Sequence, residues 1–242
     1  MKEFYSPEQV HTSESSFDAD ERAVVERLKW KNKERYEALE RAELQLKRVF
    51  ADNPEPLYRK ENLIDNRTGV AFWQVDDLFD ALVALEDLKH ILPKRYAAAI
   101  AMIRDHAQSI KTIFDRYLVW GRQEDSLLEA KAMLVDVLVM LRRIDRDRFG
   151  QDLVELSDED FRYCGRSAER RQDTPLLKQA IIAELDPTRF RRLFYNEYSA
   201  ERIARMRSSW SNSGWEETSQ CLVALDTIER ALREDRSEEH ST

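Results

Sequence analysis

The chain has 242 residues, of which 42% are hydrophobic and 36% are charged, and its formal net charge is −8. This apolar content excludes a chain that is disordered by composition, and the length is enough to bury a sizeable core. Only 5 glycines and 6 prolines are present, too few for the many turns and glycine-dependent positions of a β-sandwich or an α/β enzyme. The composition therefore predicts an all-α protein.

The first half, residues 18–150, predicts an antiparallel bundle of long helices after a flexible tail at residues 1–17. Hydrophobic residues recur three and four positions apart in four segments, at about 18–50, 72–92, 93–120 and 124–149. The segment 51–71 holds two prolines and a glycine and predicts a loop. Short connections at Pro93 and Gly121 indicate antiparallel neighbours. The last segment is apolar on most sides, so we expect it to be the central, most buried helix.

The second half, residues 151–236, predicts a smaller array of short, basic helices packed on the bundle, followed by a second flexible tail at residues 237–242. Each expected helix begins with a residue that can cap its first turn or precedes a proline. These positions are Ser157, Thr174, Asp186, Ser199 and Ser213. Local sequence alone therefore predicts five helix starts in this half.

The number of cysteines and the length of the apolar runs indicate in which cellular compartment the protein is expected. Cys164 and Cys221 are too few for a disulfide framework and too far apart for a redox motif. The N-terminal residues are polar and acidic, unlike a signal peptide. The longest apolar run, residues 132–141, is shorter than the ~20 residues that span a bilayer. We expect a reduced, cytoplasmic protein that makes no contact with membranes.

No recognisable catalytic set is present. The sequence holds no P-loop, no G-x-S-x-G and no cluster of cysteine and histidine with zinc-ligand spacing. One Asp-x-x-His pair, Asp87 with His90, falls short of a di-iron bundle, which needs two such motifs. We expect His90 and His106 to be structural and Cys164 to be an ordinary helix residue, and we predict no cofactor. A helical metal- or cofactor-binding enzyme that uses these histidines or Asp136 is the second alternative.

Asp136 lies in an apolar stretch of its predicted helix. Glu129, Asp136 and Arg143 are each seven residues apart, so they can share one polar stripe, and this favours an exposed carboxylate. The alternative is a buried carboxylate paired with a lysine or arginine from another helix, because an unpaired buried charge is costly.

A basic segment interrupts this acidic chain. Residues 161–210 hold 11 Lys and Arg against 6 Asp and Glu, a charge of +5 that leaves −13 on the remainder. Helical spacing places aromatic residues such as Phe190 and Phe194 in the core and directs the arginines outward. Planar guanidinium groups suit carboxylates and phosphates. The expected partner-binding residues are Arg189, Arg191, Arg192, Arg202, Arg205 and Arg207, unless the chain's own acids pair with them.

The leading functional hypothesis is a non-enzymatic helical interaction or assembly subunit that binds another protein through this arginine-rich region. The first alternative is a nucleic-acid-binding subunit of a larger complex, with the same arginines on phosphates. SAERIARM (199–206) resembles the first helix of a helix-turn-helix, with Ser208 where that turn prefers glycine. RFRRLF (189–194) is similar to a run in the small helical subunits of CRISPR surveillance complexes, which implies contact with a nucleic-acid backbone. Homo-oligomerisation through the 18–50 helix is a further expectation.

Overall fold

The computed structural model describes residues 22–27, 33–51, 68–89, 91–150, 153–166, 175–211 and 218–233. These residues fold into helices and contain no strand, so the predicted all-α fold class is confirmed. The two predicted tails and most of the predicted 51–71 loop lie outside these ranges. None of the helices within them is both long and apolar enough to cross a bilayer.

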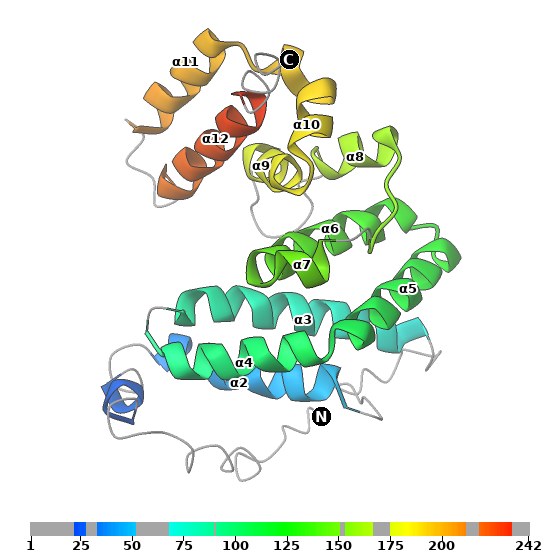
Figure 1. The fold of residues 1–242 in the computed structure, drawn as a ribbon, viewed down its shortest axis with the longest axis vertical. Helices are drawn as coiled ribbons and strands as arrows, with labels where there is room; N and C mark the ends of the chain where they lie inside the picture. The colour runs from blue at the N-terminus through cyan, green and yellow to red at the C-terminus, as the bar shows by residue number, and fades with distance from the viewer. Residues whose placement is uncertain are drawn as a thin grey trace, which may run out of the picture.

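The long helices form the lower layers of the molecule in Figure 1. They follow a short helix at residues 22–27 and are α2 (Lys33–Val49), α3 (Thr68–Leu88), α4 (Pro93–Asp105), α5 (Ala107–Gln123) and α6 (Leu127–Ile144), with a single turn, α7 (Arg146–Phe149), at the end. α3 packs against α2, α5 and α6. Their inward side chains form one hydrophobic cluster, which includes Leu46, Leu82, Ile103, Phe114 and Leu138.

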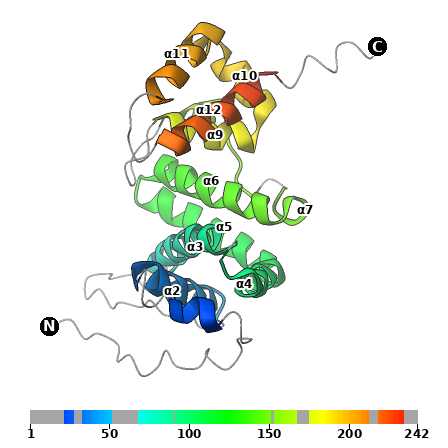
Figure 2. The ribbon, with the colours of Figure 1, turned by 90° about the vertical axis from the view of Figure 1, so that its left-hand side faces the viewer.

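Shorter helices form the upper layers, and Figure 2 shows them stacked above α6. They are α8 (Asp158–Cys164), α9 (Pro175–Leu185), α10 (Pro187–Phe194), the 3₁₀ turn η3 (Tyr195–Glu197), α11 (Ala200–Ser211) and α12 (Thr218–Arg233). α9 packs on both α6 and α12. A second hydrophobic cluster fills this part, with Phe161, Ile182, Phe190, Phe194 and Leu225 fully buried.

α6 is the helix that the two clusters share. Leu134, Val137 and Leu141 belong to the long-helix cluster, whereas Ala132 and Val135 belong to the short-helix cluster. Ten of its residues are buried. The prediction of a central, most buried helix in this segment is therefore confirmed.

Three of the predicted helix starts are confirmed by their capping contacts. Ser157 and Asp160 form a reciprocal capping box at the start of α8. The side chain of Asp186 accepts a hydrogen bond from the backbone N–H of Arg189 at 2.9 Å, and Ser199 caps α11. α9 begins at Pro175, as predicted, and Ser213 lies outside the described residues.

The predicted 93–120 helix is wrong in its continuity, because the chain leaves the helical conformation at His106 (φ −103°, ψ 20°). The imidazole there stacks on Phe50 with ring centroids 4.5 Å apart. Ile103 and Ile110 are seven residues apart and both fully buried, so the hydrophobic period runs on across the break and conceals it. α3 also starts earlier than expected, at Thr68 inside the predicted loop.

Candidate functional site

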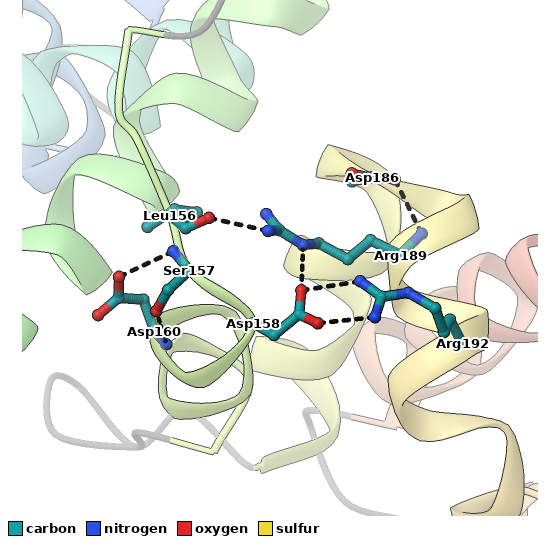
Figure 3. Close-up of polar contacts among 7 residues, drawn as sticks. All are labelled: Leu156, Ser157, Asp158, Asp160, Asp186, Arg189 and Arg192. Carbon is teal, nitrogen blue, oxygen red and sulfur yellow. Dashed lines mark hydrogen bonds and ion pairs between the residues drawn. The ribbon is translucent and has the colours of Figure 1, made fainter.

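Two of the six expected partner-binding arginines hold α10 against α8 (Figure 3). The Nη atoms of Arg192 lie 2.7 and 2.8 Å from the two carboxylate oxygens of Asp158. Arg189 reaches the same carboxylate through Nε at 2.9 Å and donates to the carbonyl oxygen of Leu156 at 2.8 Å. This bidentate geometry is the one that arginine favours with carboxylates. Arg189 and Arg192 therefore have a partner within the chain.

The charge of Asp158 depends on these arginines. Hydrogen bonds from Arg192 and then Arg189 lower the pKa of Asp158 to about 2. The same contact raises the pKa of Arg192. The pairs therefore remain ionised at neutral pH, and the 43% exposed side chain of Asp158 leaves them screened by solvent.

A third arginine joins α11 to α12. Arg207 lies 2.7 Å from a carboxylate oxygen of Asp226 and 2.9 Å from one of Glu229. The hydrogen bonds with these acids raise its pKa. Arg207 therefore also serves an internal contact.

Arg202 and Arg205 lie on the exposed side of α11. Arg202 donates through Nη1 to the carbonyl oxygen of Glu197 at 2.6 Å, and its guanidinium lies 5.6 Å from the centroid of the Tyr198 ring. Arg205 is exposed and makes no ion pair with any residue that the structure describes. Arg191, the sixth arginine, is half-buried on α10. Arg189 and Arg192 therefore share Asp158, whereas Arg202 and Arg207 have other partners, so the six arginines do not form one site.

We define the outer α11 surface as Tyr195, Arg202 and Arg205. Tyr195 opens the 3₁₀ turn that precedes α11 and is 58% exposed. Ile203 is the one buried residue of the twelve in α11. The helix is thus held to α12 along a narrow stripe, and its other side faces solvent.

The carboxylate of Asp136 is buried, and the expectation that it would be exposed is wrong. Its exposed fraction is 8%, and it forms an ion pair with Lys178 of α9. The sequence pattern was misleading because α9 covers this side of α6, and nothing local to α6 indicates that cover. The pair joins the layers and suggests no catalytic role by itself.

Cys164 is buried and His106 is stacked on Phe50, as expected of residues that serve the packing. Burial, followed by the nearby carboxylates of Asp136 and Asp160, raises the pKa of the Cys164 thiol to about 12. His106 is half-buried and stacked, while His90 lies outside the described residues. Across the described ranges, no three His, Cys, Asp or Glu side chains are grouped as a metal site would need.

Sequence reasoning missed another group of arginines, at the end of α6. Arg142, Arg143 and Arg146 meet Arg230 of α12 around a cavity of about 280 Å³. Four arginines between residues 142 and 148 were a local signal. The contribution of α12, however, lies more than eighty residues further along the chain. Only the fold shows that these side chains surround one space.

Comparison with known proteins gives no relative from which a function could be inferred. No family model, no curated protein and no solved structure matches the chain.

Proposed function

We propose that this chain is a non-enzymatic helical assembly subunit of the cytoplasm that binds another protein through the outer α11 surface. The observation that carries the proposal is the placement of the exposed side chains of Arg202 and Arg205 on a helix with a single buried residue. Arginine and tyrosine are the residue types that most often supply binding energy at protein interfaces. An exposed tyrosine lies in the turn just before these two arginines.

The orientation of Arg202 supports this assignment. Its guanidinium is held by the carbonyl oxygen of Glu197 and by the ring of Tyr198 before any partner arrives. A side chain that is already ordered loses less conformational entropy when it binds. The remaining N–H groups of the guanidinium can donate to a carboxylate. An acidic segment of a partner protein fits these donors.

Protein is favoured over nucleic acid by the internal ion pairs. Arg189, Arg192 and Arg207 are neutralised by carboxylates of the same chain, which leaves few cations to track a phosphate backbone. The exposed residue Glu201, which precedes Arg202 in the sequence, also lies on α11. A surface of mixed charge suits a protein partner better than a uniformly negative polymer.

The test is capture of partners from the native cell with tagged protein, before and after nuclease treatment. We expect a protein partner that survives nuclease and is lost when Arg202→Glu and Arg205→Glu are combined. Helical circular dichroism should stay unchanged, because both side chains are exposed.

The matched control combines Arg116→Glu with Arg122→Glu on the exposed side of α5. It changes the net charge by the same amount, so it separates a local contact from a general electrostatic effect. Equal capture by both double variants would remove the outer α11 surface from consideration. Loss of all captured material on nuclease treatment would favour the nucleic-acid alternative.

A further inference from the structure

The cavity at the end of α6 lies where five helices meet. Its wall comes from the last turns of α6 and α9, the first residues of α7 and α10, and the last turns of α12. Its charged lining residues are Arg142, Arg143, Arg146, Arg230 and Glu184. The rest of the wall is made chiefly of small and apolar residues such as Ala183 and Ala231. At about 280 Å³, the cavity is near the lower end of the ~300–1,000 Å³ range of small-molecule sites.

Two of these arginines are fixed by the fold. Arg142 donates through Nη1 to the carbonyl oxygen of Leu185 at 2.8 Å. Arg143 lies 2.7 and 2.6 Å from the two carboxylate oxygens of Glu184, and 3.0 Å from Glu86. A guanidinium has five N–H donors, so each arginine keeps donors beyond these bonds. Arg142 is half-buried, whereas Arg143 is 46% exposed and shares its charge with two carboxylates.

The other two arginines are not used by the fold. Arg146 begins α7 and Arg230 lies in the last turn of α12, and both are exposed. Within the described part of the chain, neither makes an ion pair or a hydrogen bond through its side chain. They reach the same space from two separate helices. Two positive charges that share one cavity repel each other, and this electrostatic cost is removed when an anion lies between them.

The charge in the cavity indicates the class of ligand. Four arginines and Glu184 give the wall a net charge of +3, and Glu86, which pairs with Arg143 from outside the wall, lowers this to +2. A phosphoryl group carries up to two negative charges and offers three acceptor oxygens. Arginine binds such oxygens in a bidentate manner. We propose that this cavity binds the phosphoryl group of a small phosphorylated molecule, with Arg146 and Arg230 closing on it against Arg142.

The experiment is isothermal titration of the full chain with inorganic pyrophosphate, at about 50 mM chloride so that screening stays low. We expect one site per chain. Combining Arg146→Gln with Arg230→Gln should weaken binding by at least about tenfold, because two charge-assisted contacts are lost. Combining Arg116→Gln with Arg122→Gln on α5 should leave the affinity unchanged. A thermal melt of each variant with and without pyrophosphate gives a second readout of the same site.

Several outcomes would overturn the proposal. These are the absence of binding at about 1 mM pyrophosphate, equal weakening in both double variants, and acetate binding as tightly as pyrophosphate. Displacement of pyrophosphate by a single-stranded oligonucleotide would also overturn it, since a polymer would then be the ligand. The site uses none of the residues of the outer α11 surface, so it stands or fails independently of the proposed assembly function.

Discussion

The ammonium group of Lys178 on α9 pairs with the carboxylate of Asp136 on α6, and both side chains are at least nine-tenths buried. The pair lies where α6 meets the short-helix cluster, beside the buried Val135. Removing one charge from such a pair leaves the other without compensation in a medium that solvates it poorly. The contact is therefore sensitive to single substitutions and tolerant of a paired one.

Lys178→Met should lower the free energy of unfolding by about 3–5 kcal/mol, because Asp136 then stays buried without its counter-charge. Combining it with Asp136→Leu should recover most of that loss, since two apolar side chains of similar volume replace the pair. Urea unfolding at neutral pH, followed by circular dichroism, measures both variants. A single variant that costs less than about 1 kcal/mol would show that the pair is solvated in solution.

Asp158 should make stability depend on acid pH. Its pKa is about 2 in the folded chain against an ordinary value of 3.8, so its stabilising contribution is complete above pH 3.8. That contribution is lost as the pH falls toward 2. Asp158→Asn should therefore lower the melting temperature at neutral pH, and the gap to the native chain should narrow below pH 3.8. Asp115→Asn, on the exposed side of α5, is the control. A difference in melting temperature between Asp158→Asn and the native chain that stays constant down to about pH 2 would contradict the ion-pair assignment.

Gly121 sets how closely α5 approaches α6. A Cβ atom at this position would lie 2.7 Å from the Cβ of Ala130 and 3.3 Å from the Cα of Leu127. Gly121→Ala should therefore lower stability by up to about 2 kcal/mol, because overpacking costs ~1–3 kcal/mol and the gain in helix propensity returns only ~1 kcal/mol. Thermal and urea unfolding measure this loss.

The partner substitution at the same contact tests the cause. Ala130→Gly removes the atom that a new Cβ would strike, so the double variant should be more stable than the sum of the two single effects. Strict additivity would mean that the strain arises elsewhere in the α5–α6 turn.

Local signals predicted the fold well in the second half. Ser157, Asp186 and Ser199 lie at helix starts because a capping side chain bonds to backbone only two or three residues away. Such contacts depend on short stretches of sequence. Hydrophobic periodicity, in contrast, did not predict where α4 ends and α5 begins. The hydrophobic stripe continues past His106, although the backbone there is not helical.

The candidate sites were harder to predict, since they depend on which helices meet. Arg192 is exposed on α10, as expected, whereas Arg189 is half-buried, and α8 brings Asp158 to meet both. Arg142 and Arg230 are far apart in sequence and line one cavity. Periodicity says which side of a helix is polar, whereas the partner of each charge depends on tertiary packing.

The shared position of α6 limits how the protein can be divided. Ala132 and Val135 face the upper cluster while Leu134 and Val137 face the lower one, so a single helix serves as a common wall. A fragment that ended at residue 150 would expose an apolar strip of α6 to water. It would also leave the carboxylate of Asp136 without the ammonium group of Lys178. Truncation and domain-swap experiments on this chain would therefore yield aggregation-prone fragments unless that strip were redesigned with polar side chains.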